Sequence, residues 1–132
     1  MNRYQILIEY EGTLYNGWQI QKKGKSIQEN IEIVLSKLLK EKIKIYGSGR
    51  TDTGVHAKEQ SAHFDTTNKI IQKDKLLNSL NFFLNKKKIS ILKIKKKNKL
   101  FHSRYSAKER RYIYLIRNDV SPSVINFNRE WH

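Results

Sequence analysis

The sequence predicts an α+β domain in which two helices pack on one face of an antiparallel sheet. Three observations support this fold class. Stretches rich in β-branched and aromatic residues alternate with two stretches of helical periodicity, in the order strand, helix, strand, strand, helix, strand. No linker or repeat divides the 132 residues. A chain of this length can bury about two-thirds of its unfolded surface, so a hydrophobic share of 38% is enough for a core.

The first strand and the first helix have clear local signals. Residues 4–10 are rich in strand-forming side chains and end at a glycine-containing turn. Ser26 and Glu29 match a capping box, in which the serine hydroxyl accepts from the glutamate N–H and the glutamate side chain reaches back. Apolar residues then recur on one helical face, so we predict a helix over 27–40.

The later elements follow from the same two periodicities. Strands are predicted over 43–46 and 60–65, on either side of a glycine-containing loop. Leucine and phenylalanine at helical spacing predict a second helix over 73–84. A fourth strand is predicted from 89 to about 94, where it runs into lysines, and an additional strand over 110–117.

The order β-α-β-β-α-β is that of the split βαβ, or ferredoxin-like, arrangement, with the additional strand following it. Such a sheet has one face that no helix covers, and proteins with this fold often place RNA there. The fold is compatible with RNA binding but does not identify it, because many functions share one fold.

The net charge suggests a polyanionic partner without proving one. The chain has 27 Lys and Arg against 12 Asp and Glu, a formal charge of +15, and nucleic acid is the commonest partner for such a surface. Most of these residues are lysine, and the chain is also rich in Ile and Asn, so AT-rich codons would give the same composition. Five of the seven arginines lie at position 50 and in segment 104–117, where the chemically informative motifs also lie.

The residue types that are missing narrow the function further. The sequence contains no cysteine, which excludes disulfides, thiolate metal sites and cysteine nucleophiles. No apolar stretch is long enough to cross a membrane, and the first residues look like a strand and not like a signal sequence. We therefore expect a soluble, cytoplasmic protein.

Residues 47–57 read Gly-Ser-Gly-Arg-Thr-Asp-Thr-Gly-Val-His-Ala and carry the main candidate chemistry. They lack the third glycine of a dinucleotide-binding loop and the Lys and Ser or Thr of a P-loop, and they lead into a strand where both motifs need a helix. Side chains two apart in an extended stretch point to the same side, so Arg50 would favour an ionised Asp52. The residues alone leave open whether Asp52 is a nucleophile, a base or a turn-forming aspartate.

This loop resembles the catalytic loop of the TruA-type tRNA pseudouridine synthases, which has a Gly-Arg-Thr-Asp-x-Gly-Val-His pattern. Other segments resemble the family in the same order, and ordered matches over nearly the whole chain are more specific than any single motif. These segments are Ile8-Glu9-Tyr10-Glu11-Gly12-Thr13 with Tyr15-Asn16-Gly17-Trp18-Gln19, Ser26-Ile27-Gln28-Glu29, and Phe101-His102-Ser103-Arg104-Tyr105-Ser106-Ala107 with Arg110-Arg111-Tyr112.

The resemblance implies an RNA-binding isomerase of tRNA processing and tRNA modification, which converts uridine to pseudouridine in the anticodon stem-loop of tRNA. It implies no metal and no organic cofactor, and a target base that is extruded from the RNA stack. By the same resemblance Asp52 is the catalytic carboxylate, Arg50 fills the space left by the base and contacts phosphate, and Tyr112 stacks on the uracil and relays its proton. His56 is expected to be a hydrogen-bonding brace.

The residues themselves leave alternatives to these roles. Arg50 could form a structural ion pair with Asp52, and Tyr112 could be a core residue of its strand. Tyr15 and Trp18 are expected to pack against the loop and not to contact RNA. Lysine and arginine on the open sheet face are expected to contact phosphates.

Members of the family have two related α/β domains, act as homodimers and are about twice this length. The chain resembles their amino-terminal half, so residues 1–132 are expected to form a single amino-terminal domain without the second one. Two hypotheses follow: a piece of a tRNA pseudouridine synthase, or an inactive truncated fragment that acts at most as a basic RNA-binding module. In both cases we expect exposed apolar surface where the second domain would dock.

Overall fold

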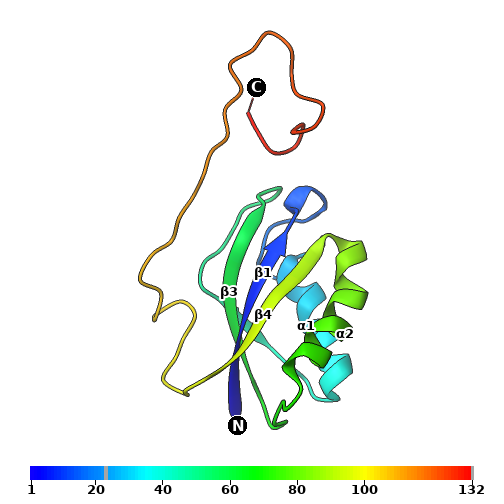
Figure 1. The fold of residues 1–132 in the computed structure, drawn as a ribbon, viewed down its shortest axis with the longest axis vertical. Helices are drawn as coiled ribbons and strands as arrows, with labels where there is room; N and C mark the ends of the chain where they lie inside the picture. The colour runs from blue at the N-terminus through cyan, green and yellow to red at the C-terminus, as the bar shows by residue number, and fades with distance from the viewer. Residues whose placement is uncertain (23, 132) are drawn as a thin grey trace.

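The computed structural model describes residues 1–22 and 24–131. Its strands occur in the order β2-β3-β1-β4 with antiparallel neighbours, which is the predicted ferredoxin-like sheet. Both helices cover one face of this sheet (Figure 1). The elements are β1 (Asn2–Tyr10), η1 (Gly12–Leu14), α1 (Ile27–Leu39), β2 (Ile45–Gly47), β3 (Ala57–Thr66), α2 (Lys73–Leu84), η2 (Asn85–Lys87) and β4 (Ile89–Lys97).

Helix α1 begins where the capping signal predicts. The hydroxyl of Ser26 accepts a hydrogen bond from the backbone N–H of Glu29 at 3.1 Å. The helix ends at Leu39 because Lys40 adopts the left-handed conformation, with φ of 53°. Among the described residues, neither helix is long and apolar enough to cross a membrane.

The core lies between the helices and the alternate residues of the central strands. Tyr4, Ile6 and Ile8 of β1 are buried on this face. Tyr4 lies opposite Phe64 of β3, and their rings stack with centroids 5.8 Å apart. The hydroxyl of Tyr4 accepts from the backbone N–H of Ile70 at 2.8 Å, so the polar end of this buried ring is satisfied.

The other face of the sheet has no helix, as predicted, but residues 99–106 cover part of it. Arg3 of β1 fastens this cover to the sheet. Its guanidinium forms an ion pair with Asp65 of β3 at 2.8 Å and donates to the carbonyl oxygens of Lys99, at 2.9 Å, and Phe101, at 2.5 Å. Arg3 is therefore engaged by the protein and does not offer its charge to a phosphate.

His63 is the centre of this covered region and is only 1% exposed. Its Nδ1 atom accepts from the backbone N–H of Ser103 at 3.1 Å. The Tyr46 ring stacks on it at 5.2 Å between centroids, and the His102 ring meets it edge-on at 4.6 Å. Because Nδ1 accepts, the ring is neutral with its proton on Nε2.

The strand predicted over 110–117 is not formed, which corrects the sequence-based expectation. Within the described chain, residues 107–115 have no regular structure, and Ile116 makes a single isolated bridge with Trp131. Alternating side chains give a strand only where a neighbouring strand can exchange hydrogen bonds, and this segment runs away from the sheet (Figure 1).

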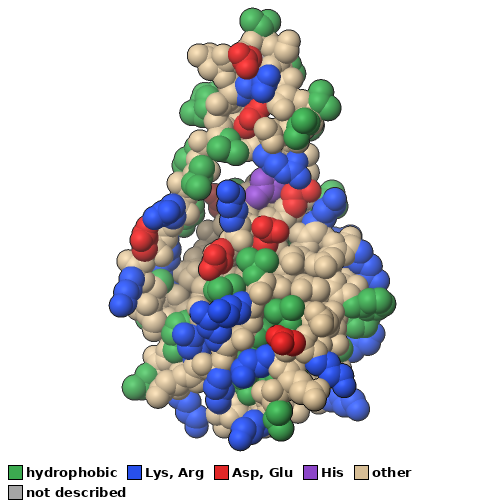
Figure 2. Space-filling model, in the orientation of Figure 1, with side chains coloured by type: hydrophobic (Ala, Val, Ile, Leu, Met, Phe, Trp, Pro, Cys, Tyr) green, Lys and Arg blue, Asp and Glu red, His purple; other side chains and the backbone are tan. Residues whose placement is uncertain are grey.

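Residues 105–131 form an extended arm with many exposed apolar side chains, and exposed apolar surface is what the sequence predicts. Figure 2 shows hydrophobic side chains at intervals along this arm. Val120, for example, is 99% exposed. The exposed large hydrophobic residues of the arm are Tyr105, Tyr112, Ile113, Tyr114, Leu115, Ile116, Val120, Val124, Ile125, Phe127 and Trp131.

We predict that the stability of the chain falls as the pH is lowered from 6.5 to about 4, because His63 is neutral in the fold. Burial and the charges of Arg3 and His102 lower the pKa of His63 from 6.5 to about 4, although Asp65 acts in the opposite direction. In this range the unfolded chain binds a proton that the folded chain does not. The stability is therefore complete above pH 6.5 and decreases on acidification, by about 3 kcal/mol.

Urea unfolding at a series of pH values measures this loss. In His63→Asn the amide oxygen can still accept from Ser103 but does not titrate, so the free energy of unfolding should depend much less on pH in this range. Carboxyl groups such as Asp65, whose pKa is lowered by its hydrogen bond with Arg3, titrate in both proteins and cancel in the comparison. An equal pH dependence in the two proteins would contradict the prediction.

Candidate active site

Residues 47–56, the 47–56 loop, connect β2 to β3 and are held by the turn that follows β1. The backbone N–H of Trp18 donates to the carbonyl of Thr51 at 3.1 Å, and the N–H of Gly54 donates to the carbonyl of Tyr15 at 3.3 Å. The hydroxyl groups of Tyr10 and Thr51 lie 2.7 Å apart. Hydrogen bonds of the main chain and of the Thr51 side chain therefore hold the loop directly before Asp52.

Glycine allows the two backbones to come this close. A Cβ atom on Gly12 would lie 2.0 Å from the carbonyl oxygen of Val55, and one on Gly17 would lie 2.5 Å from that of Thr51. Gly17 also has φ of +88°, which other residues rarely adopt. Any larger residue at Gly12 would have to separate the loop from the turn.

Tyr15 and Trp18 are both buried next to the loop, as expected for packing residues. They are 4% and 3% exposed. The indole lies so close to Gly47 that a Cβ there would be 2.7 Å from its nitrogen. The indole of Trp18 thus packs against the start of the loop, whereas Tyr15 meets the loop through its backbone carbonyl and its hydroxyl donates to the carbonyl of Lys87.

Asp52 lies at the surface of this fixed loop. Its backbone carbonyl accepts from the N–H of Val55 at 3.2 Å, so the main chain itself closes the turn. Its side chain is exposed, and no hydrogen bond or ion pair of the carboxylate occurs with any of residues 1–22 and 24–131. Both carboxylate oxygens are thus accessible to another molecule.

Arg50 is also exposed, two residues before Asp52. The structural ion pair between them, which the sequence left open, is not formed in the described part of the chain. The Arg50 guanidinium therefore remains available to a group outside the protein.

Tyr112 reaches the same loop from the distant end of the chain. Its hydroxyl oxygen lies 3.9 Å from the position of a Cβ on Gly49, and its side chain is 63% exposed, so it is not a core residue. Burial raises the pKa of Tyr10, the hydrogen bond with Thr51 lowers it, and the charge of the nearby Tyr112 phenol raises it further. Two phenols thus lie close to the segment that contains Asp52.

Arg110 links the extended arm to the loop, a role that the sequence does not predict. Its Nε atom donates to the carbonyl of Ser48 at 2.8 Å, and its Nη2 atom donates to the carbonyl of Arg104 at 2.8 Å. The side-chain amide of Gln60 supports the same part of the loop by donating to the carbonyl of Gly49 at 2.6 Å. The family motif contains Arg110, but nothing in the sequence indicates which carbonyls it binds.

His56 is a brace, as predicted. Its Nδ1 atom accepts from the backbone N–H of Gly12 at 2.8 Å, so the proton lies on Nε2, which donates to the carbonyl of Asn128. The ring joins the turn after β1, the loop and the arm. Among the described residues, no group of three or more His, Cys, Asp or Glu side chains could hold a metal ion.

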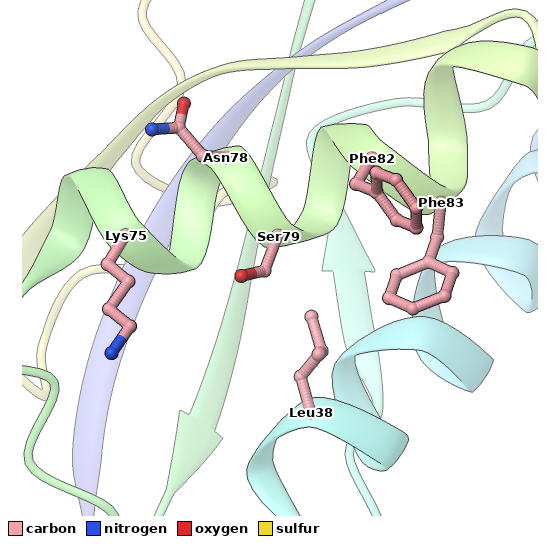
Figure 3. A pocket seen from close by; sticks show the side chains of 6 residues that line it. All are labelled: Leu38, Lys75, Asn78, Ser79, Phe82 and Phe83. Carbon is pink, nitrogen blue, oxygen red and sulfur yellow. The ribbon is translucent and has the colours of Figure 1, made fainter.

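The hollow drawn in Figure 3 lies elsewhere, on the helical layer. It has a volume of about 570 Å³ and is lined by residues of α1 and α2, none of which belongs to the 47–56 loop. Its lining has no carboxylate, so it is not a candidate for the same chemistry. The lining residues are Leu38, Lys75, Asn78, Ser79, Phe82 and Phe83.

Comparison with known proteins relates the chain to tRNA pseudouridine synthases. Residues 6–106 match the sequence profile of the tRNA pseudouridine synthases. Proteins named tRNA pseudouridine synthase A are 58% identical over 132 residues in Pelagibacter ubique, 45% over 130 in Neorickettsia sennetsu and 43% over 133 in Anaplasma phagocytophilum. These alignments cover 98 to 100% of this chain but 53 to 54% of the relatives.

The chain therefore spans about half the length of the curated relatives that it matches. The family match includes residues 6–10 of β1, both helices, the 47–56 loop and the cover over the open sheet face. On this evidence the chain belongs to the tRNA pseudouridine synthase family.

Proposed function

We propose that this chain supplies the catalytic aspartate of an enzyme that isomerises uridine to pseudouridine in the anticodon stem-loop of tRNA. The observation that carries the proposal is the free carboxylate of Asp52, exposed on a fixed loop whose Gly49 lies beside the phenol of Tyr112. The names of the relatives support the reaction and the tRNA substrate. The choice of the anticodon stem-loop rests on the family resemblance.

The chemistry of the proposed reaction requires a carboxylate and a surface for an extruded base. The bond between N1 of uracil and C1′ of ribose breaks, the uracil turns, and a bond from C5 to C1′ forms while C5 loses its proton and N1 gains one. Asp52 either attacks the sugar or removes one of its protons, and no atoms are gained overall. Tyr112 stacks on the uracil and accepts or relays the C5 proton, and base stacking of this kind contributes about 1 to 3 kcal/mol.

We expect the exposed Arg50 to occupy the space that the extruded base leaves and to contact phosphate. Further basic residues lie on the open face of β4, where Lys93, Lys95 and Lys97 pair with alternate residues of β1. Figure 2 shows Lys and Arg side chains widely spread over the body of the molecule, with fewer acidic ones. We expect tRNA affinity to fall with salt concentration, since phosphate contacts release counterions.

The proposed enzyme needs more than residues 1–132. The Tyr112 side of the site is open, and the arm over residues 105–131 exposes many apolar side chains. We propose that this chain forms an amino-terminal domain that acts together with a second domain, as the half-length alignments with the relatives suggest. The homodimer and the cytoplasmic location remain predictions.

The alternative is an inactive module that only binds RNA. The open site and the coverage of about half of each relative favour it for the chain by itself. The retention of Asp52, Arg50 and Tyr112 favours the enzyme. The two functions differ in turnover and not in RNA binding.

We predict that the 132-residue chain alone releases little tritium from C5-labelled uridine in tRNA, because its site is open on the Tyr112 side. A chimera that joins it to the part of the Pelagibacter ubique relative outside the alignment should release tritium efficiently. Robust turnover by the chain alone would overturn the two-domain proposal. A folded, tRNA-binding chimera without turnover would favour the RNA-binding module.

In the same chimera, Asp52→Asn should lower turnover by roughly 10⁴-fold, since the isosteric amide can neither attack the sugar nor take its proton. The tRNA dissociation constant should change little, because the substitution does not touch the basic surface. Asp74→Asn on α2 makes the same chemical change outside the site and should leave turnover unchanged. If Asp52→Asn weakened binding in parallel with turnover, a structural role for Asp52 would replace the catalytic one.

A further inference from the structure

Residues 103–110 are fastened at both ends, and we call this segment the strap. At the sheet, His63 accepts from the backbone N–H of Ser103 at 3.1 Å. At the 47–56 loop, the guanidinium of Arg110 binds the carbonyls of Ser48 and Arg104, each at 2.8 Å. The Arg110 side chain thus binds both another residue of the strap and a residue of the loop.

The sheet end of the strap depends on a histidine that stays a hydrogen-bond acceptor. His63 is 1% exposed, and the hydroxyl of Ser103 also lies 3.1 Å from its Nδ1 atom. Burial keeps the ring neutral near physiological pH because it lowers the pKa to about 4. A charged ring would donate from Nδ1 and lose the Ser103 contact.

The loop end of the strap depends on the shape of the guanidinium. Arg110 can reach two carbonyl oxygens at once because its N–H groups point in different directions within one rigid plane. A lysine ammonium, whose donors all lie on one nitrogen atom, cannot reproduce this geometry. Arg111, the next residue, provides a contrast: among the residues that the structure describes, its guanidinium binds only the exposed Glu109, at 3.0 Å.

The strap matters for Tyr112 because the chain around that residue has no sheet to hold it. In the described structure, residues 107–115 pair with no strand. The fastening at Arg110 is two residues before Tyr112, whose hydroxyl lies 3.9 Å from the Cβ position of Gly49. The course of the chain past the loop is therefore set by the strap.

We propose that His63 and Arg110 are positioning residues for uridine isomerisation, which hold the strap between the sheet and the 47–56 loop and thereby set Tyr112 against the loop that carries Asp52. This inference rests on the proposed function. Neither residue touches the reacting atoms, and their effect on the reaction passes through the placement of the phenol.

The first test is structural and uses the 132-residue chain. Contacts between the Tyr112 ring and the α-protons of Gly49 can be followed as nuclear Overhauser effects, with sheet amide shifts as the control for folding. We expect the contact to be lost in Arg110→Lys, which keeps the charge, and to persist in Arg111→Lys. Persistence of the contact in a folded Arg110→Lys chain would overturn the proposal.

The His63 end is tested by two amides that differ by one methylene group. In His63→Asn the side-chain oxygen lies near the position of Nδ1 and can accept from Ser103, whereas in His63→Gln it extends toward the position of Nε2. We expect the Tyr112 contact with Gly49 to persist in the asparagine variant and to be lost in the glutamine variant. Equal behaviour of two folded variants would exclude His63 as the anchor.

The second test measures turnover in the chimera with the Pelagibacter ubique relative. Arg110→Lys should lower kcat by about 10-fold to 100-fold, as displacement of a reacting group by about 1 Å does, with little change in the tRNA dissociation constant. His63→Asn should retain most of the kcat that His63→Gln loses. If the unmodified chimera turns over and Arg110→Lys matches it, the positioning role is wrong. If the unmodified chimera binds tRNA but does not turn over, the proposed function itself fails, and the positioning role fails with it.

Discussion

The backbone contact between the turn after β1 and the 47–56 loop determines the geometry of this end of the molecule. It exists because Gly12 and Gly17 present no side chain to the carbonyls of Val55 and Thr51. Once the two backbones touch, Trp18 is enclosed beneath the loop and the Thr51 hydroxyl meets Tyr10. The inner side of the loop then contacts the turn, Tyr10 and Trp18, and Asp52 lies on the outer side. A free carboxylate on a loop held by such contacts suits nucleophilic or base chemistry, because its position does not have to be fixed again when substrate binds.

The positive charge of the chain serves two different purposes. Some arginines hold the fold: Arg3 binds Asp65 and two carbonyls of the cover, and Arg110 binds two carbonyls across the strap. Arg50 and the lysines of β4 remain at the surface and can meet phosphates. The net charge of +15 therefore overstates the part that is available to RNA. The buried His63 also holds the fold, but it does so as a neutral hydrogen-bond acceptor and adds nothing to the positive charge.

The sequence predicted the elements whose signals are local. Helix α2 has the predicted bounds because its periodicity lies within the segment itself, and α1 begins at its predicted cap. Strand β3 begins at Ala57 and not at residue 60, because pairing with β1 draws polar residues into the sheet, and such pairing cannot be read locally. The strand expected over 110–117 had the right alternation but no partner. At the site, motif and resemblance pointed to Asp52 and Tyr112, whereas the contacts of Arg110 and the close approach at Gly12 depend on distant segments meeting in space.

The most direct measurement of the central constraint is amide hydrogen exchange in the Gly12→Ala variant of the 132-residue chain. A methyl group there would lie 2.0 Å from the Val55 carbonyl, so the loop must move away from the turn. The amides of Trp18 and Gly54, which cross between the two segments, should then exchange at least about tenfold faster, a change of about 1.4 kcal/mol in opening free energy. Leu14→Ala, at a 70% exposed position of the same turn, should leave both rates unchanged. Unchanged protection of Trp18 and Gly54 in Gly12→Ala would contradict this account.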